Sequence, residues 1–226
     1  MQRSRINQLI ADAERRFADA GLYLPEWAHW TPADWEANAG RCAAIFEARL
    51  GWDLTDFGRG DFQRTGLLLF TVRNGTPRAD SRLPYAEKLM LVGDRQLTPS
   101  HFHWSKTEDI INRGGGTLVL ELHLADRATE QLSEHPFRVW RDGIELEGAA
   151  GMRVELSPGQ SITLTPYLYH SFWAEGGSCI VGEVSSVNDD ATDNRFLEAV
   201  GRFPAIEEDA APRRLLCTDY GGVSGG

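Results

Sequence analysis

Short runs rich in β-branched and aromatic residues alternate with tight-turn signals from about residue 65 to residue 187. The turn signals are Gly- or Pro-containing groups at Asn74-Gly75, Gly114-Gly115-Gly116, Asp142-Gly143, Ser157-Pro158-Gly159 and Gly176-Gly177. Such punctuation predicts that each run is a separate strand. The predicted strands are 67–73, 85–92, 100–104, 117–124, 137–140, 152–156, 161–165, 169–174 and 178–186. Many short strands at this spacing favour an antiparallel β-sandwich or small barrel.

The first part of the chain has a helical pattern instead. One apolar face repeats at spacings of three and four, and it consists of Ile6, Leu9, Ile10, Ala13 and Phe17. Gly21 is expected to end this helix, and Thr31-Pro32-Ala33-Asp34 to cap and begin the next one. We expect a single domain over 1–226, with a mainly helical segment 1–60, a barrel 61–190 and a C-terminal extension 191–226. A short helix is expected near 195–200.

Composition limits the partners of such a chain. The 226 residues are 42% apolar and carry a formal net charge of −10, which argues against disorder and against a nucleic-acid partner. No apolar stretch approaches the roughly 20 residues of a membrane span, and no signal peptide is expected. The three cysteines are far apart. They predict no disulfide framework and favour the cytoplasm.

The chemical signal is a pair of histidines followed by a glutamate and a distant third histidine. His101 and His103 are two apart on a predicted strand, so their side chains share one face. Glu108 follows after a short turn, and His170 begins another predicted strand. An isolated His-x-His pair is more often structural, but three of the six histidines belong to this one pattern. Neutral imidazoles with a carboxylate suit a divalent ion, so the four residues are predicted metal ligands.

This pattern resembles the two motifs of the cupin superfamily, with Gly93 and Gly114 flanking the first and Pro158-Gly159 and Pro166 preceding His170. Gly93 lies further from His101 than the usual motif has it. The resemblance implies a β-sandwich closed into a small jelly-roll barrel with the metal inside.

A closer resemblance covers most of the chain. The sequence is similar to the D-lyxose isomerase family in the segments Leu50-Gly51-Trp52-Asp53, Thr55-Asp56-Phe57-Gly58, 69–75, 101–113, 182–190 and 192–196. That family implies a Mn²⁺-dependent aldose–ketose isomerase that interconverts D-lyxose with D-xylulose, commonly also D-mannose with D-fructose. It also implies a homodimer. The metal present in the cell and the preferred sugar are left open by the sequence.

Two residues near the predicted ligands are candidate catalytic groups. Lys106 lies in the turn before Glu108 and is either a solvated loop charge or a group that stabilises charge on a substrate oxygen. Glu183 lies on an otherwise small and apolar strand. It either pairs with a cation such as Arg195 or Lys88, or serves as an acid/base in the cavity, and the resemblance favours the second role. A hydride shift, which needs no such base, stays open.

Three further residues are assigned to substrate binding: Lys88, Asp193 and Arg195. For Asp193 and Arg195 the alternative is a loop salt bridge. The function expected from these residues is isomerisation of a free, unphosphorylated sugar. Three histidines and one glutamate are also used by iron cupin dioxygenases, and a non-catalytic sugar-binding barrel is the third alternative.

Overall fold

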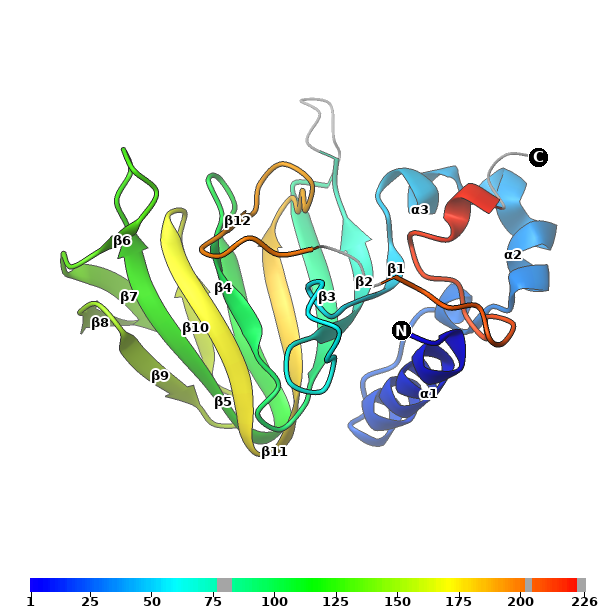
Figure 1. Cartoon of the computed structure of the whole chain (residues 1–226), viewed down its shortest axis with the longest axis horizontal. Helices are drawn as coiled ribbons and strands as arrows, with labels where there is room; N and C mark the ends of the chain where they lie inside the picture. Colours follow the sequence, from blue (N-terminus) through cyan, green and yellow to red (C-terminus); the bar gives the residue numbers. More distant parts are fainter. Residues whose placement is uncertain (77–82, 202–204, 223–226) are drawn as a thin grey trace.

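A computed structural model describes residues 1–76, 83–201 and 205–222 (Figure 1). Its helical part consists of α1 (Arg3–Asp19), α2 (Pro32–Asn38), α3 (Ala43–Glu47) and the 3-10 turns Glu26–His29, Ala39–Arg41 and Tyr220–Gly222. Its strands are β1 (Gly51–Thr55), β2 (Leu67–Asn74), β3 (Tyr85–Val92), β4 (Thr98–Phe102), β5 (Glu108–Ala125), β6 (Leu132–Ser133), β7 (Phe137–Arg141), β8 (Ile144–Gly148), β9 (Met152–Leu156), β10 (Ser161–Leu164), β11 (Leu168–Ser186) and β12 (Arg195–Phe196).

Two long strands, β5 and β11, pair with each other along most of their lengths and belong to both layers of a sandwich. The first half of β5 pairs with β10 and the second half of β11 pairs with β3. The other halves pair with β9 and with β4. All of these pairings are antiparallel, and Figure 1 shows the resulting sheet curled around its core. The predicted mainly antiparallel β fold is therefore confirmed.

The strands bend where turns were predicted. Gly114-Gly115-Gly116 and Gly176-Gly177 lie inside β5 and β11, and the register of the pair shifts between Glu175 and Cys179. Gly115 has a φ of 102°, and a Cβ there would lie 2.0 Å from the carbonyl oxygen of Ser178. Glycine thus permits a bulge that carries one strand around the corner of the sandwich. The prediction that 169–174 and 178–186 are separate strands was wrong, because both ranges lie in the one continuous strand β11.

Other local predictions have mixed outcomes. The turn at Asp142-Gly143 is confirmed, because both residues have positive φ and connect β7 to β8. The helix expected near 195–200 was wrong. Arg195 and Phe196 instead form β12, which pairs with β4. Strand β1 was not expected, and it extends the sheet into the segment predicted as mainly helical.

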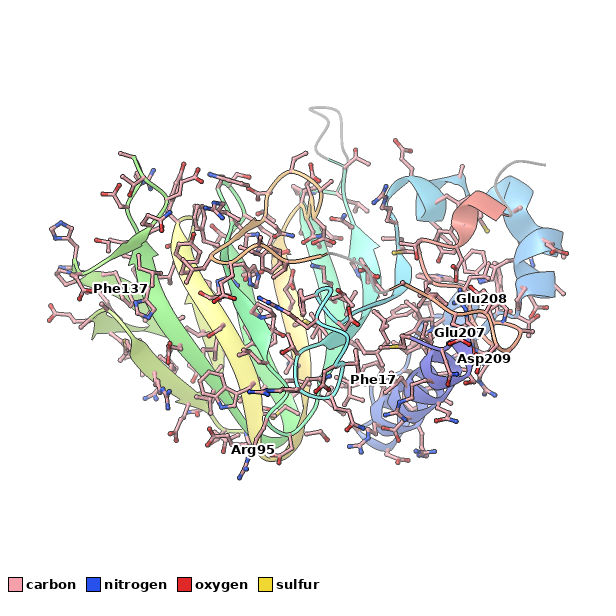
Figure 2. The ribbon with its side chains drawn as sticks, in the orientation of Figure 1. Phe17, Arg95, Phe137, Glu207, Glu208 and Asp209 are labelled. Carbon is pink, nitrogen blue, oxygen red and sulfur yellow. The ribbon has the colours of Figure 1, made fainter. Side chains whose placement is uncertain are left out.

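Helix α1 packs on the outer face of the sheet. Ile6, Ile10, Ala13 and Phe17 are at most 1% exposed and contact the outward side chains of β1, β2 and β3. Figure 2 shows Phe17 between α1 and the sheet. The expected helix end at Gly21 and the Thr31 cap are confirmed, the latter as a capping box with Asp34. None of the described helices is long and apolar enough to cross a membrane.

The interior of the sandwich holds the second and larger core. Side chains that alternate with those facing α1 point into it, such as Leu67 beside Leu68 and Met90 beside Leu89. Strands β1 to β3 are therefore buried on both faces. At the opposite end, β7 and β9 alternate buried and exposed residues, and Phe137 lies at this end (Figure 2).

Candidate active site

A cavity of about 320 Å³ lies inside the sandwich, and both apolar and charged side chains line it. The apolar lining residues include Phe57, Leu67, Leu69, Met90, Phe172 and Phe196. The charged and polar lining residues include Asp53, Lys88, Lys106, Glu108, Glu183 and Asp190, together with His101, His103 and His170. The residues assigned from the sequence as metal ligands and catalytic groups therefore face one space.

The three histidines come from β4, from the residues just after it, and from β11. His170 lies opposite His101 in the strand pairing, and His103 follows the end of β4. One ring nitrogen of each lies within 4.8 Å of the others. His103 and His170 are 5% and 1% exposed, and His101 is partly exposed. This geometry is sufficient for one ion to contact all three rings.

Backbone carbonyls determine which nitrogen of each ring carries the proton. His101 Nδ1 lies 2.9 Å from the carbonyl oxygen of Pro99, and His170 Nδ1 lies 3.0 Å from that of Leu168. His103 Nδ1 lies 2.7 Å from the carbonyl oxygen of Asp193. A carbonyl only accepts, so in a neutral ring Nδ1 is the donor and Nε2 presents a lone pair. This second hydrogen bond is the usual way in which proteins orient a metal-binding histidine.

Glu108 completes a group of converging acceptors. Its Oε1 lies 3.0 Å from His170 Nε2, and its Oε2 lies 3.5 Å from His103 Nε2. The Nε2 atoms of His103 and His170 are buried and have no hydrogen-bond partner among the described residues. Buried acceptors without donors are costly, and a cation between them removes the cost. The four residues therefore fit a divalent ion, as the sequence predicted.

Two lysines and two glutamates form a continuous charged chain next to the histidines. Lys106 Nζ lies 2.6 Å from Glu108 Oε2 and 2.9 Å from Glu183 Oε1. Lys88 Nζ lies 3.2 Å from Glu183 Oε1. All four side chains are at most 6% exposed. Glu183 thus pairs with Lys88, which was the structural alternative for this residue. It also lines the cavity, which a role as acid or base requires.

Burial and pairing act in opposite directions on these charges. Burial alone would raise the pKa of Glu183, but Lys106 and Lys88 outweigh it and lower that pKa. Burial alone would lower the pKa of Lys106, but Glu108 and Glu183 raise it. Burial, with His170 and His103, lowers the pKa of His101 well below its usual 6.5. At neutral pH the site therefore holds an ionised Glu183, a protonated Lys106 and a neutral His101.

Some residues of the site lie in segments that carry the family resemblance but were given no role from the sequence. Asn188 Oδ1 accepts hydrogen bonds from Lys88 Nζ at 2.7 Å and from Lys106 Nζ at 3.2 Å. Asp53 and Asp190 line the cavity from β1 and from the segment after β11. Asn188 lies in a polar stretch without periodicity, where asparagine usually marks a turn. Only the fold brings it against two lysines that precede it by 100 and 82 residues.

Two residues assigned to substrate binding lie elsewhere. The cavity lining, within the described part of the chain, includes neither Asp193 nor Arg195. Arg195 Nε lies 3.0 Å from Glu130 Oε2, and Glu130 also accepts from Trp104 Nε1. The Asp193 carboxylate accepts hydrogen bonds from Ser105 and Lys106 backbone groups. Arg195 therefore forms the loop ion pair that was the alternative to substrate binding. Asp193 instead bonds the loop that contains Ser105 and Lys106. Lys88 does line the cavity.

Comparison with known proteins identifies relatives over nearly the whole chain. The family model described as D-lyxose isomerase matches residues 1–220. A D-lyxose/D-mannose isomerase of Serratia proteamaculans is 49% identical over 224 residues, covering 97% of this chain and 98% of that protein. Its counterpart in Escherichia coli O157:H7 is 46% identical over 224 residues, with the same coverage of 97% and 98%.

A solved structure shares the fold at low sequence identity. The L-ribose isomerase of Cellulomonas parahominis, determined with no ligand, is 16% identical and has a TM-score of 0.59. The match covers 92% of this chain and 98% of that one. At this identity the likeness concerns the fold alone.

Proposed function

The chain belongs to the D-lyxose isomerase family, and we propose that it interconverts D-lyxose with D-xylulose and D-mannose with D-fructose. The observation that carries the proposal is the convergence of three histidine Nε2 atoms and the Glu108 carboxylate beside a buried Lys–Glu–Lys group. The first arrangement suits a divalent ion. The second provides a base and an acid next to it.

His101, His103, Glu108 and His170 would hold the ion, and we propose Mn²⁺, which suits nitrogen and oxygen ligands. Bound there, the ion supplies Lewis-acid polarisation of the sugar carbonyl. Apolar side chains such as Phe172 and Phe196 also line the cavity, and they would exclude water from the sugar.

Glu183 is the proposed base. In the aldose-to-ketose direction it takes the proton from C2 and delivers a proton to C1, and the proton exchanges in part with water while the carboxyl holds it. The hydroxyl proton of O2 moves to O1, so no atom or electron is gained or lost. Lys106 donates hydrogen bonds to the sugar oxygen that carries negative charge between the two proton transfers. An ionised Glu183 and a protonated Lys106 are the forms that these roles require.

Lys88 keeps Glu183 ionised and, because it lines the cavity, is available to a sugar hydroxyl. Among the described residues that line the cavity, Lys88 and Lys106 are the lysines and arginines, and both contact Glu183. A phosphate group would need a cation that is not already paired. This charge balance supports a free sugar as the substrate rather than a sugar phosphate.

The proposal is tested by assaying the Mn²⁺-loaded enzyme on a panel of free aldoses and measuring the ketose formed. Conversion of D-lyxose and D-mannose is expected, with far lower specificity constants for the corresponding sugar phosphates. Oxygen uptake with Fe²⁺ and sugar, without ketose, would instead indicate a dioxygenase. Sugar binding without either product would indicate a non-catalytic barrel.

We also propose a homodimer in the cytoplasm. Cys42 and Cys179 are buried thiols that form no disulfide, which agrees with a reducing compartment. Light scattering after size exclusion should give twice the chain mass of 25.2 kDa. A mass equal to one chain contradicts the dimer and leaves the proposed reaction intact.

A further inference from the structure

The segment between β4 and β5 carries two residues of the site within four positions. His103 and Lys106 both lie there, and neither belongs to a strand. The carbonyl of His103 accepts from the Tyr167 backbone N–H at 2.9 Å. Thr107 is held by the end of β11, because its carbonyl accepts from the Ser186 N–H at 3.0 Å. These two bonds fix the backbone at His103 and Thr107, so the backbone N–H groups of the residues between them require another acceptor.

Asp193 provides that partner. Its Oδ1 accepts from the Ser105 backbone N–H at 2.9 Å, and its Oδ2 accepts from the Ser105 hydroxyl and the Lys106 backbone N–H, both at 2.9 Å. Its own carbonyl accepts from His103 Nδ1 at 2.7 Å. Asp193, which is 8% exposed, thus bonds three of the four positions from 103 to 106, namely His103, Ser105 and Lys106. A neutral side chain with a single acceptor could not accept all three donors.

Long-range pairing places Asp193 at this position. Arg195 and Phe196 form β12 and pair with Phe102 and His101 of β4. The residues just before β12 are therefore brought beside those just after β4. Within its own segment, the Asp193 N–H donates to the carbonyl of Asp189 at 2.9 Å, which secures the turn that precedes it.

We propose that Asp193 is a positioning residue of the isomerase: its carboxylate aims Lys106 at Glu183, and its carbonyl orients the ring of His103. This inference rests on the proposed function and extends it, because it assigns Asp193 a role without contact to the sugar. The Lys106 ammonium must meet Glu108, Glu183 and Asn188 at once, and this depends on where its backbone begins. A displacement of about 1 Å in such a group can cost about 10²-fold in rate.

The test is a graded series measured at saturating Mn²⁺. Asp193→Ala removes all three acceptor contacts, Asp193→Asn removes one of the two carboxylate acceptors, and Ser105→Ala removes only the hydroxyl donor. We expect kcat to fall by about 10²-fold for Asp193→Ala and by progressively less for the other two. The Michaelis constant should change much less than kcat. If Asp193→Ala does not fold, the kcat values of the other two variants test the proposal. Asp193→Asn should then have a lower kcat than Ser105→Ala, and both should lie below wild type.

A matched control separates this role from general loop stability. Asp126 Oδ1 accepts from the Ala128 N–H, the Thr129 N–H and the Thr129 hydroxyl, the same three kinds of donor, in a loop that does not line the cavity. Asp126→Ala should leave kcat unchanged. An equal loss of kcat in Asp126→Ala and Asp193→Ala overturns the proposal.

A double mutant shows through which residue Asp193 acts. In a Lys106→Met background, Asp193→Ala should lower kcat by less than about 3-fold, because its target is already absent. Full additivity of the two losses contradicts the proposal. Titration with Mn²⁺ alone provides a readout without turnover. Asp193→Ala should weaken binding by about 10-fold, because without the side-chain contacts to Ser105 and Lys106 the Asp193 carbonyl is no longer held against the ring of His103. Unchanged Mn²⁺ affinity and kcat overturn the role of Asp193, whereas a wild-type enzyme that forms no ketose overturns the function itself.

Discussion

Within the described residues, two charged clusters can be compared, each with a buried cation, and the one inside the barrel faces a cavity that a ligand can enter. The barrel cluster consists of His101, His103, Glu108 and His170 with Lys88, Lys106 and Glu183. The Arg3 cluster consists of Arg3, Glu208 and Asp219, and it ties α1 to the C-terminal segment. Figure 2 shows Glu208 beside α1. Arg3 is 3% exposed, yet its guanidinium makes four hydrogen bonds to these two carboxylates, at 2.7–3.2 Å.

The difference lies in how donors and acceptors balance. In the Arg3 cluster every donor that the guanidinium directs at the carboxylates has an acceptor, so the cluster is complete without a ligand. In the barrel cluster three imidazole lone pairs and a carboxylate converge, and two Nε2 atoms have no partner in the described structure. Burial of charge alone therefore does not identify a site. A site is identified instead by an excess of buried acceptors that face a cavity.

The largest expected effect is on the barrel cluster. Removal of the divalent ion by a chelator should lower kcat by about 10³-fold or more, since a Lewis acid contributes several kcal/mol. Readdition of Mn²⁺ should restore activity and raise Tm, because the ion binds the folded state. Full activity in a metal-free preparation contradicts the comparison between the two clusters.

The Arg3 cluster should respond in stability and not in turnover. Arg3→Met keeps the apolar stem but loses the hydrogen bonds, and we expect about 2 kcal/mol less free energy of unfolding. Denaturant unfolding measures this, with kcat on D-lyxose as the second readout. Arg15→Met is the matched control on the same helix, because Arg15 is 66% exposed and pairs with a nearby Asp12. It should cost less than about 0.5 kcal/mol.

A smaller effect concerns the pH dependence of the barrel cluster. Lys88 helps to lower the pKa of Glu183, so Lys88→Met should raise that pKa. A base with a raised pKa becomes protonated at higher pH, so the acid limb of kcat/KM should move upward by about one pH unit. Lys88→Arg retains the charge and should leave the limb near its wild-type position. An unmoved limb in Lys88→Met contradicts the assignment of Glu183 as base.

Local sequence patterns predicted the features whose causes are local. The apolar face of α1, the Thr31 cap and the alternation of short strands follow from spacing within a few residues. The four predicted ligands were recognisable because strand period places His101 and His103 together and the family pattern supplies Glu108 and His170. The three histidines converge and Glu108 lies against two of them, as that pattern requires, although His103 lies just beyond the strand.

What the sequence did not predict depends on distant pairings. Glycines at 114–116 and 176–177 are compatible with a turn or with a bulge in a continuous strand, and only the partner strand decides between them. Asn188 bonds the two lysines, and Arg195 pairs with Glu130 outside the cavity. Both contacts arise because β11 and β12 pair with strands that are far away in the chain. Each local segment by itself is an ordinary polar loop.

The most direct test of the central claim, that the barrel cluster is a catalytic metal site with Glu183 as its base, is the turnover of Glu183→Gln on D-lyxose. Glutamine keeps the size and one acceptor but cannot take a proton, so kcat should fall by about 10²- to 10⁴-fold. Bound Mn²⁺ and Tm should stay near wild type, and wild-type enzyme in tritiated water should place tritium in the ketose. Near-normal turnover in Glu183→Gln would contradict the account and favour a hydride shift or another base. Loss of metal and fold together would make Glu183 a structural partner only.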